Sequence, residues 1–218
     1  LGVVLYIKVV IVLEILYNIS TIIKAIKRGV ILEKSKKNEL WDWIKTIAVA
    51  VFFVMAMRMF IFSPILVDGA SMMPTYEDGD RVIVNKIGKH FSSIERFDVI
   101  VFEAPIGDDY IKRVIGLPGD HIAYEGDTLY VNGEAVEEPY LEEYKEQLLD
   151  NGLLTYNFTL ESITDYEEIP EGYLFVLGDN RRKTADSRDP RVGLVPMEKV
   201  LGKAHFRIYP FDNVGIVK

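Results

Sequence analysis

Thr128-Leu-Tyr-Val-Asn-Gly-Glu-Ala-Val136 contains two short apolar runs separated by the pair Asn132-Gly133. An Asn-Gly pair favours the two-residue turn of a β-hairpin, because both residues tolerate positive φ and the turn matches the twist of the flanking strands. We therefore predict two antiparallel strands here, at Thr128–Val131 and Glu134–Val136.

Similar short runs, rich in β-branched and aromatic residues and bounded by turn residues, recur beyond residue 65. They are Arg81–Asn85, Asp98–Phe102, Tyr110–Ile115, His121–Tyr124, Tyr173–Leu177 and His205–Tyr209. Their spacing predicts a mainly β fold built from antiparallel sheet. Only Glu142–Leu149 is typical of a helix, and the acidic stretch 137–171 is predicted to be a solvated insertion.

Residues 44–63 form a long apolar segment of another kind. Thr46–Met57 carries no charge, and Arg58 is the one charged residue between Thr46 and Val67. About 20 mostly apolar residues cross the hydrocarbon core of a bilayer, and Trp41 and Trp43 are typical of its interface. We predict a transmembrane helix at 44–63, with a buried core helix as the alternative.

Residues 1–23 are also apolar but include Lys8 and Glu14. They are predicted to form either another transmembrane helix or an interfacial helix. The basic loop 24–43 is expected to stay in the cytoplasm under the positive-inside rule. Residues 64–218 would then form a domain on the outer face of a cell membrane.

The charge and cysteine content exclude several classes of function. Residues 1–62 hold nine Lys/Arg and four Asp/Glu, against sixteen and twenty-nine in the remainder. So acidic a domain argues against nucleic acid as a partner, because phosphate binding needs a basic face. The chain has no cysteine, which excludes disulfides and thiol chemistry. Its three histidines do not have ligand spacing, so we expect no metal and no cofactor.

Ser71 and Lys112 are the candidate catalytic residues. Ser71 lies in Val67-Asp-Gly-Ala-Ser-Met-Met-Pro-Thr75, and Lys112 lies in Tyr110-Ile-Lys-Arg-Val-Ile-Gly-Leu-Pro-Gly-Asp120. A serine hydroxyl is a poor nucleophile near neutral pH, and a neutral lysine amine within hydrogen-bond reach can activate it. Either residue alone would be an ordinary turn or surface residue. A third polar segment, Gly178–Arg188, further favours a serine/lysine hydrolase.

On these three segments the chain resembles the bacterial type I signal peptidases, the membrane-bound serine proteases that remove signal peptides from exported proteins. The resemblance covers roughly residues 41–210 and is closest to Gram-positive members. It implies an antiparallel β catalytic domain behind one or two transmembrane helices, and cleavage after small residues in an Ala-x-Ala pattern. It also implies Ser71 as nucleophile and Lys112 as general base, whose ordinary pKa near 10.4 the site must lower by desolvation.

The same resemblance implies supporting roles for other residues. Thr184 stands where the family usually has a serine that orients the lysine, and Asp186 and Arg188 would form a supporting ion pair. Gly69 replaces a serine that donates to the oxyanion in many Gram-negative members, so its backbone N–H would join that of Ser71.

The loop and the substrate pockets also take their expected residues from the resemblance. Asp179 and Asn180 would shape the loop, although Asn180 and Arg181 could equally be plain turn residues. The walls of the substrate pockets would include five residues, some of which could simply pack the core: Ile65, Val67, Met72, Tyr110 and Ile111.

The expected partners are signal peptides of exported preproteins, the lipid bilayer and, transiently, the secretion machinery. Residues 60–67 and Phe206–Phe211 could rest on the lipid surface. Two other functions stay open. A self-cleaving Ser/Lys regulator of the SOS-repressor type would need a DNA-binding module and a cleavage site before Ser71, and neither is visible. A catalytically inactive, membrane-tethered β domain is kept open by the changes at Gly69 and Thr184.

Overall fold

The computed structural model describes residues 39–60, 62–86, 93–105, 107–146, 148 and 152–217. The chain divides into two units, the first ending at Phe53 and the second covering Val54–Lys218. The prediction for residues 1–23 and most of that for the loop 24–43 lie outside the described residues.

Helix α2 covers Glu39–Phe60. It begins within the predicted loop and ends before residue 63, because strand β1 (Phe62–Leu66) follows at once. Pro64 explains the boundary, since proline breaks a helix interior but is tolerated in an edge strand, and β1 is an edge strand. In the part of the chain that the structure describes, no helix is long and apolar enough to cross a membrane. The transmembrane helix at 44–63 stays a prediction.

The larger sheet is antiparallel and has the strand order β1-β2-β11-β3-β4-β9-β10, with β12 paired to β11. Its strands after β1 are β2 (Arg81–Asn85), β3 (Val99–Glu103), β4 (Asp109–Gly116), β9 (Tyr173–Leu177), β10 (Val195–Pro196), β11 (Val200–Tyr209) and β12 (Gly215–Ile216). The late strand β11 thus lies between β2 and β3. Gly202 permits this close approach, since a Cβ there would lie 2.5 Å from the Asn85 carbonyl oxygen.

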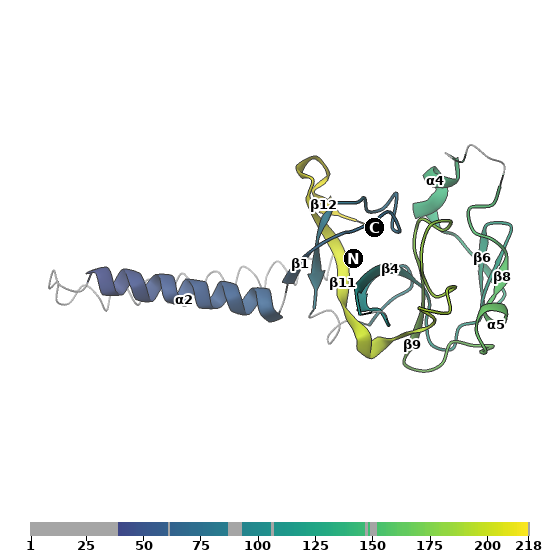
Figure 1. The fold of residues 1–218 in the computed structure, drawn as a ribbon, viewed down its shortest axis with the longest axis horizontal. Coiled ribbons are helices and arrows are strands. Elements are labelled where there is room, and N and C mark those ends of the chain that lie inside the picture. The colour runs from purple at the N-terminus through teal and green to yellow at the C-terminus, as the bar shows by residue number, and fades with distance from the viewer. Residues whose placement is uncertain are drawn as a thin grey trace. The chain divides into compact units, whose positions relative to one another are not determined.

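A smaller antiparallel sheet has the order β7-β6-β5-β8. Its strands are β5 (Ile122–Glu125), β6 (Thr128–Val131), β7 (Glu134–Val136) and β8 (Phe158–Thr159). Asn132 and Gly133 have φ of 53° and 81°, and Val131 pairs with Glu134, which confirms the predicted hairpin. Figure 1 shows β6 and β8 at one end of the β domain, away from β1.

The remaining helices are short. They are η1 (Pro139–Leu141), α4 (Glu142–Glu146), α5 (Leu160–Ile163), η2 (Met197–Lys199) and η3 (Phe211–Asn213). Helix α4 lies within the predicted helix at Glu142–Leu149.

The acidic stretch 137–171 is not the wholly solvated insertion that the sequence predicts. Leu141, Leu154 and Leu160 are at most 1% exposed, and Phe158 of β8 packs in the core of the smaller sheet. The acidic residues dominate the composition, but the apolar residues between them bury a large area and fold the stretch onto the domain.

Candidate active site

Ser71 lies in the connection between β1 and β2. Met72 and Tyr76, which flank the turn, are fully buried, and the Tyr76 hydroxyl donates to the Ala204 carbonyl of β11 at 2.9 Å. The Tyr76 amide also donates to the Met72 carbonyl at 2.9 Å. The apolar side chains therefore fix the turn to the sheet and leave the Ser71 hydroxyl partly exposed.

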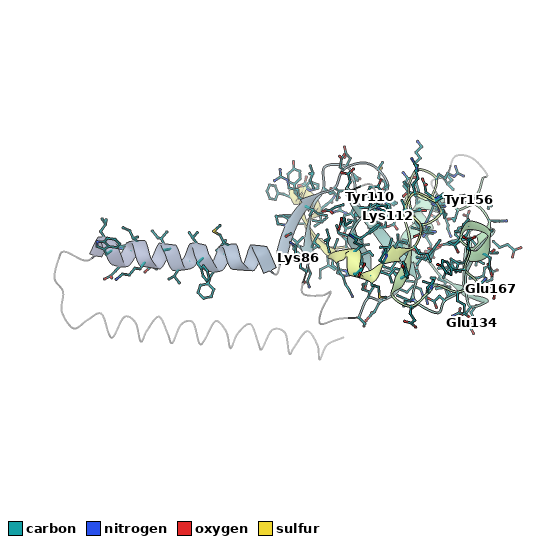
Figure 2. The ribbon with its side chains drawn as sticks, turned by 60° about the horizontal axis from the view of Figure 1, so that its bottom comes forward. Lys86, Tyr110, Lys112, Glu134, Tyr156 and Glu167 are labelled. Atoms are coloured by element: carbon teal, nitrogen blue, oxygen red, sulfur yellow. The ribbon has the colours of Figure 1, made fainter. Side chains whose placement is uncertain are left out.

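Lys112 lies in β4 and is only 3% exposed. Its Nζ is 2.9 Å from Ser71 Oγ and donates to the Ile111 carbonyl at 2.9 Å. The Tyr110 ring is the next neighbour, with its centroid 5.0 Å from Nζ, and Figure 2 shows the two side chains close together. The structure therefore brings the two predicted catalytic residues into hydrogen-bond contact.

Burial lowers the pKa of Lys112 from 10.5 to about 8, because desolvation disfavours the charged ammonium. The nearby carboxylates of Asp186 and Asp179 act in the opposite direction and raise the same pKa. Desolvation is the larger effect. Near pH 8 about half of the molecules then carry the neutral amine that proton abstraction needs.

The loop after β9 holds the Ser71 turn from behind. The Asn180 amide donates to the Ser71 carbonyl at 3.1 Å, and its Nδ2 donates to the Ala70 carbonyl at 2.9 Å. Asp186 and Arg188 form an ion pair with a 2.7 Å contact, and Asp186 also accepts from the Gly178 amide at 3.1 Å. Asn180 is thus more than a turn residue, since it donates to the carbonyl groups of both Ala70 and Ser71, the peptide groups on either side of the Ser71 Cα.

Thr184 lies near the contact between Gly178 and the Ser71 backbone. Its Oγ1 is buried and has no hydrogen-bond partner among the described residues. A Cβ added to Gly178 would lie 2.2 Å from Thr184 Oγ1 and 2.5 Å from the Ser71 carbonyl oxygen, so the hydroxyl is close to the Ser71 backbone. The hydrogen bond to Lys112 that the resemblance implies is not formed, and the orienting role of Thr184 stays a prediction.

The predicted oxyanion donors differ in their availability. Gly69 has φ of 88°, and its N–H donates to Asp78 Oδ1 at 2.8 Å. Gly69 is therefore not the free donor that the sequence comparison implied, because a carboxylate already accepts its hydrogen bond. Ser71 N–H makes no hydrogen bond within the described residues and stays available to a developing oxyanion.

A pocket of about 490 Å³ opens at Ser71 and Lys112. Three of the five predicted substrate residues line it, namely Ile65, Tyr110 and Ile111. Val67 and Met72 do not, since they are 3% and 0% exposed and pack in the core cluster beneath. The lining also includes residues that the sequence did not indicate: Leu66, Asp68, Asp108, Asp109 and Ala185.

Sequence reasoning missed the buried ion pairs of two arginines, Arg113, which follows Lys112, and Arg181, which it treated as a possible turn residue. Arg113 forks onto Asp179 through Nε at 2.9 Å and Nη2 at 2.6 Å, and Asp179 also accepts from Thr75 Oγ1 at 2.5 Å. Arg181 contacts Glu138 at 2.5 Å. For Arg113 the available signal was a charged side chain within an apolar run, whereas Arg181 lies in a polar segment and gave no such signal.

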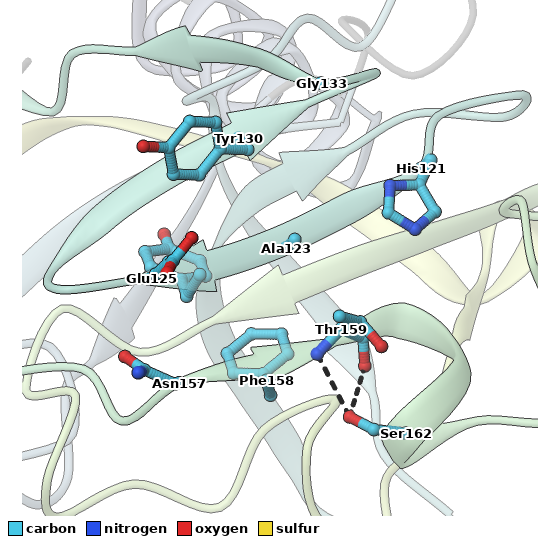
Figure 3. Close-up of a pocket in the computed structure, with 10 residues that line it drawn as sticks. His121, Ala123, Glu125, Tyr130, Gly133, Asn157, Phe158, Thr159 and Ser162 are labelled. Atoms are coloured by element: carbon cyan, nitrogen blue, oxygen red, sulfur yellow. Dashed lines mark hydrogen bonds between the residues drawn. The ribbon is translucent and has the colours of Figure 1, made fainter.

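A second pocket, of about 580 Å³, lies on the smaller sheet. Figure 3 shows its lining from β5, β6 and the β8–α5 region, including Tyr130, Phe158 and Ser162. None of the predicted site residues lines it. In the described ranges no cluster of three histidine or acidic side chains could hold a metal ion.

Comparison with known proteins shows the family of the chain. The family model described as "Signal peptidase, peptidase S26" matches residues 40–209. Signal peptidase I of Bacillus caldolyticus is 51% identical over 181 residues, covering 83% of this chain and 96% of that relative. Signal peptidase IB of Staphylococcus aureus strain Mu50 is 42% identical over 181 residues, covering 81% and 93%.

Solved structures also match this chain. A crystal structure of a signal peptidase I from Enterococcus faecalis V583 is 43% identical in sequence, with a TM-score of 0.49, covering 51% of this chain and 97% of that chain. From the family match and the curated relatives, the chain belongs to the signal peptidase family, peptidase S26, and is a serine endopeptidase that removes signal peptides.

Proposed function

We propose that Ser71 is the nucleophile of signal-peptide cleavage and that Lys112 is its general base. The observation that carries this proposal is the 2.9 Å contact between Lys112 Nζ and Ser71 Oγ. The contact places the base within hydrogen-bond reach of the proton that it must take. The lowered pKa of Lys112 supplies the neutral amine.

The reaction then runs in two halves. Ser71 Oγ attacks the scissile carbonyl carbon while Lys112 Nζ takes the hydroxyl proton, and Ser71 N–H donates to the resulting oxyanion. The C–N bond breaks as Lys112 returns the proton to the leaving amine, which leaves an ester between the signal peptide and Ser71. A water molecule, deprotonated by Lys112, hydrolyses that ester and regenerates the Ser71 hydroxyl.

We propose that the pocket beside Ser71 and Lys112 binds the small residues before the cleaved bond, in the Ala-x-Ala pattern that the family resemblance implies. Ile65, Ile111 and Ala185 provide apolar walls and Tyr110 a ring. A peptide side chain larger than the pocket is excluded by contact with these walls, since a packed interior resists deformation. The exposed main chain of the edge strand β1, which supplies Ile65, offers hydrogen bonds to an extended substrate.

We also propose that the chain is anchored to a bacterial cell membrane, with the β domain on the outer face. Helix α2 exposes large apolar side chains, among them Phe52, Phe53 and Met55 at 62–68% exposure. Such surface needs an apolar environment, and a bilayer would also concentrate the enzyme with its membrane-bound substrate. Contact with the secretion machinery stays a prediction.

A cleavage assay tests the catalytic proposal. The detergent-solubilised chain is incubated with a preprotein that carries an Ala-x-Ala site, alongside the variants Ser71→Ala and Lys112→Ala. We expect cleavage by the wild type and a loss of at least a thousandfold in either variant. Cleavage that survives Ser71→Ala would refute the dyad, and no cleavage by folded wild type would favour the inactive β domain.

A labelling assay tests the membrane orientation. Because the chain has no cysteine, a single Tyr166→Cys substitution on the exposed surface of the β domain gives one reactive thiol. A membrane-impermeant maleimide should label it in intact cells. Labelling that requires cell lysis would place the domain inside.

A further inference from the structure

Residues 138–144 follow strand β7 of the smaller sheet, include η1 and the first three residues of α4, and lie outside every sequence motif of the catalytic site. We call them the 138–144 segment. Glu138 and Leu141 are 6% and 0% exposed, so the segment is folded into the domain. Its side chains Glu138, Tyr140 and Tyr144 contact three residues of the surrounding structure: Arg113, Arg181 and Asn180.

The first contact is between Tyr140 and Arg113. The Tyr140 ring lies over the Arg113 guanidinium, with Cζ 3.8 Å from the ring centroid. Arg113 follows Lys112 in β4 and holds Asp179 with two hydrogen bonds. The ring therefore covers the guanidinium in the orientation that pairs it with Asp179, because cations are attracted to aromatic faces.

The second contact is between Glu138 and Arg181. Glu138 accepts from Arg181 Nη2 at 2.5 Å, and the Tyr140 hydroxyl lies between them, accepting from Arg181 at 3.0 Å and donating to Glu138 at 2.5 Å. Arg181 Nε in turn donates to the Gly178 carbonyl at 3.2 Å. This chain of contacts ends at the residue that packs against the Ser71 backbone.

The third contact is between Tyr144 and Asn180. The Tyr144 hydroxyl donates to Asn180 Oδ1 at 3.3 Å. The other atom of the same amide group, Nδ2, donates to the Ala70 carbonyl. Tyr144 therefore fixes the orientation of an amide that holds the residue before the nucleophile.

We propose that the 138–144 segment is a positioning element for the reaction, in which Tyr140 holds Arg113 and Tyr144 holds Asn180 so that Ser71 and Lys112 keep their contact. This inference rests on the proposed roles of Ser71 and Lys112. Neither tyrosine touches the dyad, so both act through other residues. Small displacements of reacting groups cost up to about a hundredfold in rate.

Lys112 provides a readout that a purely structural role would not change. The charged groups that act on it are Asp186, paired with Arg188, and Asp179, paired with Arg113; Asp68, Asp108 and Asp109 line the same pocket. If the Arg113 guanidinium moves away from Asp179, the Asp179 carboxylate loses its counter-charge. The unpaired carboxylate then stabilises the ammonium form of Lys112. Loss of the Tyr140 ring should therefore move the alkaline rise of activity to higher pH.

The experiment compares Tyr140→Leu, Tyr140→Phe and Tyr144→Phe with wild type in the full chain in detergent, measuring kcat, KM, thermal unfolding and the pH profile of kcat. We expect Tyr140→Leu to lower kcat about tenfold, with KM within twofold and the pH midpoint raised. Tyr140→Phe keeps the ring and should recover the pH midpoint and most of kcat. Tyr144→Phe should lower kcat about threefold without changing the unfolding temperature.

The matched control is Tyr166→Leu, which removes a tyrosine ring at 50% exposure and should leave kcat and its pH profile unchanged. An unshifted pH midpoint in folded Tyr140→Leu, with kcat lowered only by the unfolded fraction, overturns the inference. If Tyr140→Leu does not fold, the Tyr144→Phe variant tests the inference instead. A wild-type kcat in Tyr144→Phe would then overturn the inference. Failure of the proposed catalytic roles would appear separately, as cleavage that survives Ser71→Ala.

Discussion

Gly178 lies so close to Ser71 that a Cβ at position 178 would be 2.5 Å from the Ser71 carbonyl oxygen. The same Cβ would be 2.2 Å from Thr184 Oγ1. Rotation about χ1 can move Thr184 Oγ1, but it does not move the Thr184 Cβ, 2.7 Å away, and the Ser71 carbonyl moves only with its turn. Glycine at 178 is therefore needed for close approach, without any need for an unusual φ.

We predict that Gly178→Ala lowers kcat at least a hundredfold, because the methyl group displaces the Ser71 turn from Lys112. The double variant with Thr184→Ala should not recover activity, since the clash with the Ser71 backbone remains. Gly215→Ala is the control, as a Cβ there meets nothing within 4 Å. Near wild-type cleavage by Gly178→Ala would mean that the turn tolerates displacement.

A second prediction concerns the stability cost of Lys112. Its pKa, lowered from 10.5 to about 8 by burial, corresponds to about 3 kcal/mol against folding in the charged form. Between pH 8 and 10.5 the unfolded chain binds the proton and the folded chain does not, so wild-type stability rises with pH in that window. Below pH 8 both the folded and the unfolded chain bind the proton, so the full free-energy cost of burying the charged Lys112 side chain is present.

Lys112→Met should therefore raise the unfolding temperature at pH 7 while abolishing cleavage, and the gain should shrink as the pH approaches 10.5. Thermal unfolding at a series of pH values measures this. Lys199→Met, at an exposed position, should show no such pH-dependent gain. A variant equally or less stable than wild type at pH 7 would contradict the assigned cost.

Thr184 gives a third prediction. Its hydroxyl is buried without a partner in the described residues, so Thr184→Val removes no hydrogen bond and should leave the free energy of unfolding unchanged or raise it by about 1 kcal/mol. If the hydroxyl orients Lys112 during the reaction, kcat should still fall about tenfold, with Thr184→Ser remaining active. Full activity of Thr184→Val would contradict the prediction that the Thr184 hydroxyl orients Lys112.

The buried ion pair of Glu138 and Arg181 gives a fourth prediction. Both side chains are at most 2% exposed, so Glu138→Gln leaves a buried guanidinium without its counter-charge and should cost about 3–5 kcal/mol in urea unfolding. Glu103→Gln is the comparison, because its pair with Lys199 is about half exposed and should cost under about 1 kcal/mol. Equal costs would show that Arg181 finds other partners.

Local sequence patterns predicted the strands well. Arg81–Asn85, Thr128–Val131 and Tyr173–Leu177 have the predicted bounds, because β-branched runs between turn residues are a local signal. β11 was predicted only over its last five residues and begins at Val200. β1 was missed because its apolar residues continue the helical run of α2, and only pairing with β2 makes them a strand.

In the candidate site, too, the features with a local sequence signal were predicted and those that depend on the tertiary fold were not. The contact between Ser71 and Lys112 was expected from motifs that carry their own chemistry. The pairs of Arg113 with Asp179 and of Arg181 with Glu138 were not expected, because no local pattern marks these partners and only the tertiary fold brings them together. Burial of Val67 and Met72, and capture of the Gly69 amide by Asp78, likewise depend on how the chain folds back on itself.

The position of β11 also has a consequence for when the enzyme becomes active. β11 lies between β2 and β3, so it joins the part of the sheet next to Ser71 to the part that carries Lys112. A ribosome makes β11 after every other strand of that path, and domains generally fold as units during synthesis. A chain that stops before Val200 contains Ser71, Lys112 and the whole supporting loop, yet we expect it to cleave nothing in the signal-peptide assay. Cleavage by such a chain would contradict this expectation. Absence of cleavage would mean that a growing chain stays inactive until β11 has been made.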